Sequence, residues 1–240
     1  MNSKTGRTSA AVVGLMYSLL SAGSASAQWH STAIGVLEYD TKHTWLALAG
    51  LGASPGGLGV KPEVGVQVYE LGYSYPGTRN YVFSVQPYVG LADNYDGGAV
   101  AGHIGYAWAN KTVSTQFPNT VAGDQGKGVE LSGSWDQWGK NNDPMGYQVL
   151  GAYNFGSKSL WSRGRVTRNL TPGLASQRRV GAEVAYLEGN GFSAVQPGAV
   201  LEFHNPKGDI LGLGAGMKFF GHGGGNAVYL KVEGVIPMGR

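Results

Sequence analysis

Apolar and polar residues alternate along most of the chain with a period of two. In the stretch 195–203 every second residue is apolar: Val195, Pro197, Ala199, Leu201 and Phe203. After a turn at 205–208 the alternation resumes over 211–219, where glycines and one lysine stand between the apolar positions. A period of two is typical of β-strands whose two faces have different surroundings. Beyond residue 28 no segment keeps a helical period over three turns, so the pattern predicts an all-β protein.

Clusters of Gly, Pro, Asn and Asp divide this alternation into about twelve segments, with 10–12 as the range. These residue types supply the backbone conformations that tight turns need. Most breaks are short enough for sequential hairpins, and the one long connection runs from Asn110 to Gln125. The expected strands are 32–39, 43–52, 62–75, 80–91, 97–108, 127–138, 145–155, 159–169, 178–188, 192–204, 209–220 and 226–237.

The two faces of these strands differ in chemistry. One face carries Val, Leu, Ile and Met, with aromatic residues toward the segment ends. The other face is mostly Gly and Ala, with a charge at every third or fourth position. Its charged residues are Glu130, Arg163, Arg165, Arg179, Glu183, Glu202, Lys218, Lys231 and Glu233.

Two architectures fit two-faced strands. In a soluble β-sandwich the apolar rows would face inward and the charged rows would face water. In a closed barrel that spans a membrane, the apolar rows face lipid and the Gly-and-charge rows face a lumen. A lumen accounts for the sparse charge, because inward side chains crowd and glycines relieve curvature. Closure also removes the edges of long apolar strands. We therefore expect a closed, antiparallel, up-and-down transmembrane β-barrel.

The N-terminus predicts export from the cytoplasm. Lys4 and Arg7 precede an apolar run over 10–20, and 25–27 reads Ala-Ser-Ala, a small-residue cleavage site. We interpret 1–27 as a signal peptide and 28–240 as one barrel domain. Removing the signal peptide leaves 16 basic against 15 acidic residues, interspersed along the chain. This balance predicts no nucleic-acid partner.

Taken together, a signal ending Ala-Ser-Ala before Gln28-Trp29 and a dozen glycine- and tyrosine-rich strands resemble a bacterial outer-membrane β-barrel. The resemblance covers 28–240. It implies location in the cell outer membrane and contact with outer-membrane lipid. One departure is the C-terminus, which ends Ile236-Pro237-Met238-Gly239-Arg240, whereas such barrels usually finish with an aromatic residue.

Candidate chemistry is sparse. Only His30 is adjacent to a serine, and neighbouring strand residues point to opposite faces. His222 precedes three glycines, but no G-x-S-x-G elbow exists, so this segment is interpreted as a glycine hairpin. No two histidines lie within five residues, and the chain has no cysteine. We therefore expect no catalytic residues, no metal, no cofactor and no enzymatic activity.

The charged row is the candidate functional feature. Its five bases and four acids could form an interior salt-bridge network that fills the barrel, or could line a narrow channel. We expect a non-enzymatic outer-membrane barrel, structural or a narrow polar pore for a small polar solute or a polysaccharide. The alternative is an envelope accessory protein for exopolysaccharide export or secretion, since small barrels of the cellulose-biosynthesis accessory family look similar in outline. An outer-membrane lipid hydrolase is the third class.

Overall fold

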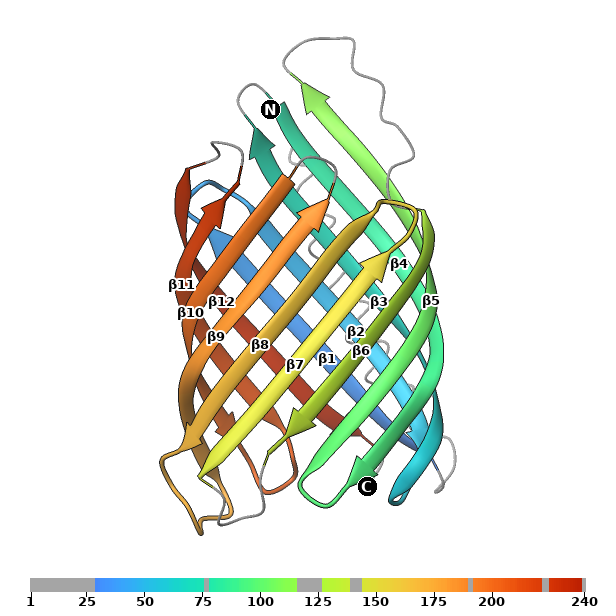
Figure 1. Ribbon diagram of the computed structural model, residues 1–240, viewed down its shortest axis with the longest axis vertical. Helices are drawn as coiled ribbons and strands as arrows, with labels where there is room; N and C mark the ends of the chain where they lie inside the picture. The colour runs from blue at the N-terminus through green and yellow to red at the C-terminus, as the bar shows by residue number, and fades with distance from the viewer. Residues whose placement is uncertain are drawn as a thin grey trace.

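The fold is a single closed barrel of antiparallel strands (Figure 1). The computed structural model describes residues 29–75, 78–115, 127–138, 144–189, 192–221 and 225–238. Each strand pairs with its neighbours in sequence, and the first pairs with the last. The strands are β1 (Trp29–Asp40), β2 (Trp45–Pro55), β3 (Gly59–Tyr75), β4 (Thr78–Tyr95), β5 (Gly98–Thr115), β6 (Gly128–Gln137), β7 (Met145–Asn154), β8 (Ser159–Asn169), β9 (Gln177–Gly189), β10 (Phe192–His204), β11 (Ile210–Phe220) and β12 (Asn226–Met238).

This architecture confirms the prediction of about twelve strands in a closed up-and-down barrel, and each expected range overlaps one observed strand. The sandwich alternative is excluded, because one closed sheet has no second sheet to cover an inward apolar face. The strand pairing also includes the unusual C-terminus: Pro237 pairs with Thr32 of β1, so the last strand closes the barrel.

The prediction of a long connection beginning at Asn110 was wrong. β5 continues to Thr115, because the backbone of 110–115 pairs with 78–83 of β4. β3, β4 and β5 are the longest strands, with 17, 18 and 18 residues. β4 and β5 rise above their neighbours at the upper end of the barrel in Figure 1. The rest of the expected connection, 116–126, lies outside the described residues.

The predicted signal peptide, 1–27, also lies outside the described residues. Within the part of the chain that the structure describes, no helix is long and apolar enough to cross a membrane.

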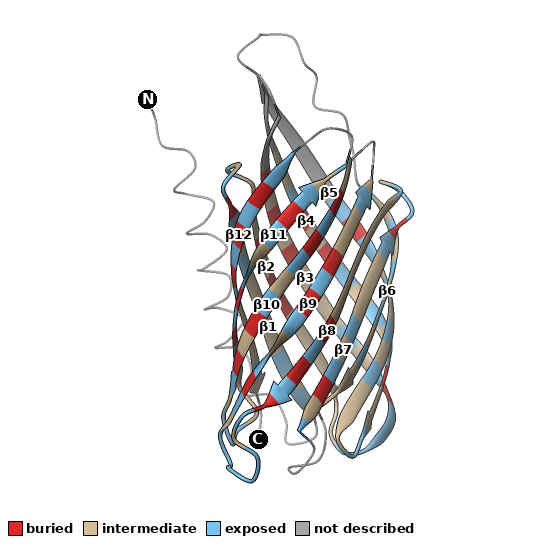
Figure 2. Ribbon diagram, turned by 60° about the vertical axis from the view of Figure 1, so that its left-hand side comes forward, coloured by how far each residue is buried: buried red, intermediate tan, exposed pale blue. Residues whose placement is uncertain are grey.

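The two faces of the strands are assigned by burial, which alternates along most strands, as on β6 and β11 (Figure 2). On β11, Leu213 is 42% exposed and Lys218 is 5% exposed. On β12, Val232 is exposed and points outward, whereas its neighbour Lys231 is buried and points inward. The apolar row therefore lies on the outer face of the barrel, and the Gly-and-charge row faces the lumen.

Aromatic side chains on the outer face gather at two levels. Near the upper end the ring centroids of Tyr106 and Trp108 lie 4.9 Å apart. Near the lower end, where β1 begins and β12 ends, Trp135 stacks on Tyr147 with centroids 6.5 Å apart. Two such girdles are typical of barrels whose outer face crosses a bilayer between its polar interfaces.

Glycines shape the tight turns at the lower end. The turn between β4 and β5 consists of Asp96 and Gly97, and Gly97 has φ +91°. The turn between β10 and β11 includes Gly208, with φ +85°. Positive φ costs a residue with a Cβ more than it costs glycine, so the sequence places these turns where the structure has them.

Candidate functional site in the barrel lumen

All nine charged side chains singled out from the sequence lie on the lumen face of their strands. Arg165, Arg179, Glu183, Glu202, Lys218 and Lys231 are buried. Glu130, Arg163 and Glu233 are of intermediate burial. Because an isolated buried charge is costly, each of these groups requires a partner, and the partners define the organisation of the lumen.

Arg165 of β8 is the centre of the largest cluster, which we call the arginine network. Its Nη2 lies 2.6 Å from Oε2 of Glu183 on β9, and its Nη1 lies 2.7 Å from Oε1 of Glu202 on β10. The same Nη1 also pairs with Glu233 of β12. One planar guanidinium thus binds three carboxylates from three strands, which its fork of five N–H donors allows.

Two further cations complete the arginine network. Arg163 Nη1 donates to Glu233 Oε2 at 2.7 Å. Lys231 pairs with Glu183, and its Nζ lies 3.7 Å from Glu233 Oε2. Tyr229 donates its hydroxyl to Glu183 at 3.4 Å. Three cations therefore face three carboxylates, and the cluster is nearly balanced in charge.

Lys218 belongs to a second cluster, and its partners were missed by the sequence analysis. Its Nζ lies 2.9 Å from Oε1 of Glu38 and 3.0 Å from Oδ2 of Asp40, both on β1. Gln196 of β10 donates to the same Glu38 oxygen at 2.9 Å. Glu38 lies in the expected strand 32–39, and Asp40 directly follows that strand. Alternation places both on one face, opposite the face of Leu37 and Tyr39. Their pairing with Lys218 depends on closure of the barrel, which joins β1 to β12 beside β11.

Neutral groups donate hydrogen bonds to Glu130 and accept them from Arg179. Gln86 of β4 donates Nε2 to Glu130 Oε1 at 2.6 Å, and Asn154 donates to the other oxygen at 3.5 Å. Arg179 donates to Thr167, to Gln177 and to the backbone carbonyl of Trp138, each at 3.1 Å. Neither residue takes part in the arginine network.

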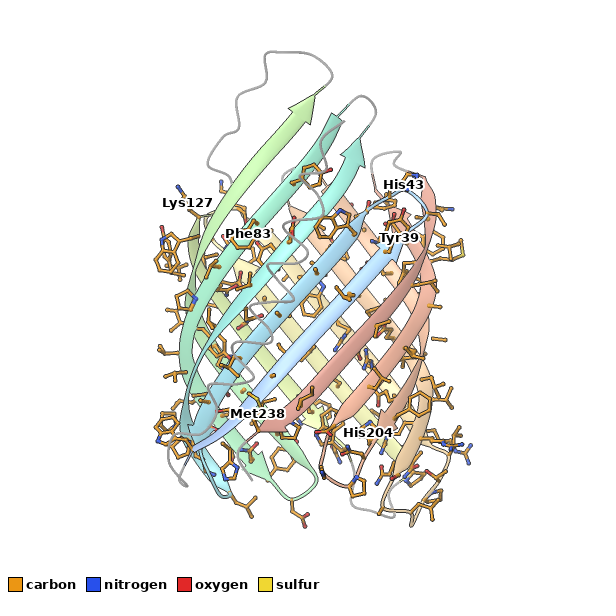
Figure 3. All side chains as sticks on the ribbon, turned by 180° about the vertical axis from the view of Figure 1, so that it is seen from behind. Tyr39, His43, Phe83, Lys127, His204 and Met238 are labelled. Carbon is orange, nitrogen blue, oxygen red and sulfur yellow. The ribbon has the colours of Figure 1, made fainter. Side chains whose placement is uncertain are left out.

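Trp138 extends this arrangement across the lower end of the lumen. It directly follows β6, yet its ring meets that of His204 at the end of β10, with centroids 5.9 Å apart. His204 Nε2 in turn lies 2.9 Å from Glu202 Oε2. Figure 3 shows His204 near the lower end of the barrel. Through Glu202, these rings connect the lower mouth to the arginine network.

The wall formed by β3, β4 and β5 has a different character. Glu63 Oε2 lies 3.2 Å from His103 Nε2, without the alignment of a hydrogen bond, and Tyr88 donates to Glu63 Oε1 at 3.4 Å. The rings of Tyr88 and His103 lie 4.7 Å apart. His103 is also the register partner of Ser132 on β6. A chain-local search for histidine and serine missed this pair, because the two residues are far apart in sequence and meet only through strand pairing.

Metal-binding geometry is not found in the described residues: they contain no group of three or more His, Asp and Glu side chains that could hold an ion.

Comparisons with known proteins support the fold. No protein-family model matches the chain, and no curated protein matches it significantly. Among solved structures, the β domain of the Bordetella autotransporter BrkA aligns with a TM-score of 0.53 and 11% identity, over 88% of this chain and 98% of that one. The translocator domain of the autotransporter NalP from Neisseria meningitidis aligns with a TM-score of 0.49 and 11% identity, over 95% and 97%. OprB from Pseudomonas putida aligns with a TM-score of 0.36 and 8% identity, over 99% and 98%.

Closed topology, outward apolar rows and a charged lumen, together with the alignment to the BrkA β domain, define the class of protein. The chain has the fold of a bacterial outer-membrane β-barrel.

Proposed function

We propose that the protein is a non-enzymatic barrel of the bacterial outer membrane whose lumen is a narrow polar pore. Its outer face would contact lipid, because the exposed large side chains there are apolar between two aromatic levels. A barrel of twelve strands is wider than the eight-stranded type that side chains fill completely, so part of the lumen is available to solute.

The observation that supports the pore most directly is the ion pair between Arg165 and Glu233. Their strands, β8 and β12, are separated in the wall by β9, β10 and β11. Because three strands lie between Arg165 and Glu233 in the wall, the two side chains meet inside the lumen and not along the wall. The arginine network therefore narrows the lumen on the side formed by β8 to β12.

On the opposite side, the lumen face of β3 to β6 carries several neutral polar groups beside the charged or titratable Glu63, His103 and Glu130. Gln67, Tyr88, Ser132 and Ser134 are all of intermediate burial, so none of them is completely covered by its neighbours. Gly65 and Gly90 stand on the same face, and the rings of Tyr88 and His103 lie over them. A passage with this lining suits a small uncharged polar solute, and the internal pairing of the charges predicts weak ion selectivity.

The test compares two adjacent residues of β6 in planar bilayers and in liposome-swelling assays. Ser132→Trp places a large ring in the passage, whereas Leu131→Trp places the same ring on the outer face. Wild type and Leu131→Trp should conduct and admit small sugars, and Ser132→Trp should do so much less. A wild-type protein that inserts without conducting, or a Ser132→Trp variant that conducts like wild type, would contradict the proposal.

A further inference from the structure

A pocket of about 530 Å³ lies at the lower end of the barrel, and the side chains of Arg178, Phe203, Leu211 and Ile236 line it from the outer face. It is formed around Gly234 of β12, which has no side chain to fill the space. Phe203, Leu211 and Ile236 stand around it and are each more than a third exposed. The register places Phe203 opposite Leu211, and Leu211 opposite Gly234, so the pocket follows one continuous row across three strands.

One end of this row is cationic. Arg178 of β9 lines the pocket and is the register partner of Phe203. Arg168 of β8 points to the same outer face, because its partner is Val180, two residues along β9 from Arg178. Diagonal neighbours of this kind lie within reach of long side chains. Both arginines are exposed, and neither guanidinium forms a hydrogen bond or ion pair with another described residue.

Two unpaired guanidinium groups lie beside an apolar hollow at the level where the strands end. This arrangement suits a ligand that carries both a phosphate and an apolar chain. A guanidinium pair recognises phosphate through charge-assisted hydrogen bonds. The hollow offers apolar contact to a chain that extends from that phosphate toward the middle of the bilayer. Asp209, which also lines the pocket, accepts a hydrogen bond from Asn205 at 2.6 Å and is thereby engaged within the β10–β11 turn.

We propose that this outer site binds a phospholipid with an anionic phosphate headgroup, from the leaflet at the end where β1 begins and β12 ends. Arg168 and Arg178 hold the phosphate, and an acyl chain occupies the hollow over Gly234. The proposal is independent of conduction through the lumen, because Arg168 and Arg178, which would hold the phosphate, and Phe203, Leu211 and Gly234, which form the hollow, face outward.

The test is native mass spectrometry of the detergent-solubilised full chain titrated with phosphatidylglycerol. The double variant Arg168→Gln/Arg178→Gln should bind at least about tenfold more weakly, the change that roughly 1.4 kcal/mol produces. Lys207→Gln, which removes a charge from the neighbouring β10–β11 turn outside the pocket, should bind like wild type. Heat-dependent gel mobility establishes that each variant is folded before binding is compared.

A second variant tests the hollow while both charges remain. Gly234→Leu fills the space without strain, since the nearest atom to an added Cβ is the Ile210 carbonyl oxygen at 3.8 Å. This variant should also weaken phosphatidylglycerol binding. Unchanged binding in the double variant, or competition by sn-glycerol 3-phosphate as strong as that by the lipid, would overturn the proposal. So would loss of lipid A binding with phosphatidylglycerol binding intact, because lipid A belongs to the opposite leaflet in such barrels.

Discussion

Arg165 on β8 and Glu233 on β12 form an ion pair across the lumen, although three strands separate them in the wall. No local contact between neighbouring strands requires this pairing. It links distant parts of the wall and would narrow the proposed pore, so its removal should affect both the stability and the permeability of the barrel.

Replacing Arg165 should destabilise the barrel strongly. Arg165→Met leaves Glu183, Glu202 and Glu233 facing one another without their shared cation, in a site where the Arg165 side chain is 4% exposed. Breaking a buried pair in this way costs about 3–5 kcal/mol. Urea unfolding of the protein in liposomes measures the change. Adding Glu233→Gln to Arg165→Met should recover part of the loss, and equal stabilities for wild type and Arg165→Met would refute the role of the network.

Lys218 should be equally important to the closure between the first and last strands. Lys218→Met leaves Glu38 and Asp40 without the cation that lies about 3 Å from both. Lys207→Met, on the exposed β10–β11 turn, is the matched control and should change stability by less than about 0.5 kcal/mol. If the two variants unfold at the same urea concentration, the ion pairs of Lys218 with Glu38 and Asp40 contribute nothing to stability.

Charge on the outer face should be poorly tolerated. Leu213→Arg places a guanidinium among apolar side chains, and at the midplane of a bilayer that costs about 2–4 kcal/mol. Ser134→Arg adds the same group to the lumen face and should fold into liposomes with a much smaller penalty. Gly214 is unsuitable as the lumen control, because a Cβ there would lie 3.1 Å from the Lys231 Cε. Folding yield measured by gel mobility distinguishes the two positions.

Two glycines at neighbouring positions should respond oppositely to alanine. At Gly90 an added Cβ would collide with the Gly102 carbonyl and the His103 ring, so Gly90→Ala should cost about 1–3 kcal/mol. At Gly102, whose register partner is Leu91, a Cβ would meet nothing within 4 Å. Gly102→Ala should therefore be neutral or slightly stabilising. Similar unfolding midpoints for the two variants would show that the lumen wall at β4 and β5 is looser than the structure indicates.

The expectation that the protein has no enzymatic activity can be tested, since the register brings His103 opposite Ser132 and near Glu63. Histidine, serine and a carboxylate are the groups of a hydrolytic triad, but no hydrogen bond joins the imidazole to the hydroxyl among the described contacts. We expect the purified protein to release no fatty acid from phospholipid vesicles. Hydrolysis that Ser132→Ala abolishes would reassign this wall as an active site.

The sequence was sufficient to predict the strands and their facing. Alternation at a period of two, broken by turn residues such as Asp96-Gly97, located all twelve strands, and the parity of Leu213 and Lys218 assigned outer and lumen faces. The alternation extends only to 108 in the fifth strand. The polar residues from Asn110 onward are strand because β4 provides a backbone partner, which a local pattern does not reveal.

Pairing within the lumen was beyond sequence reasoning for a similar reason. The row of charges was visible, but alternation gives no information on which acid meets which base across a closed barrel. Lys218 meets Glu38, 180 residues earlier in the chain, only because the first strand joins the last. The contact of Trp138 with His204 depends in the same way on the circular order of the strands.

The most direct test of the account uses nitroxide labels at two adjacent residues of β6, in a chain that has no native cysteine. Leu131 is exposed on the outer face, and Ser132 faces the lumen on β6, opposite His103 of β5. After reconstitution into bilayers, the label at Leu131→Cys should be relaxed by oxygen dissolved in lipid and protected from a water-soluble nickel chelate. The label at Ser132→Cys should show the reverse, because the chelate reaches it through the lumen. A Leu131 label shielded from oxygen, or a Ser132 label shielded from the chelate, would contradict the central claim that this barrel places its apolar row in lipid and keeps a polar passage inside.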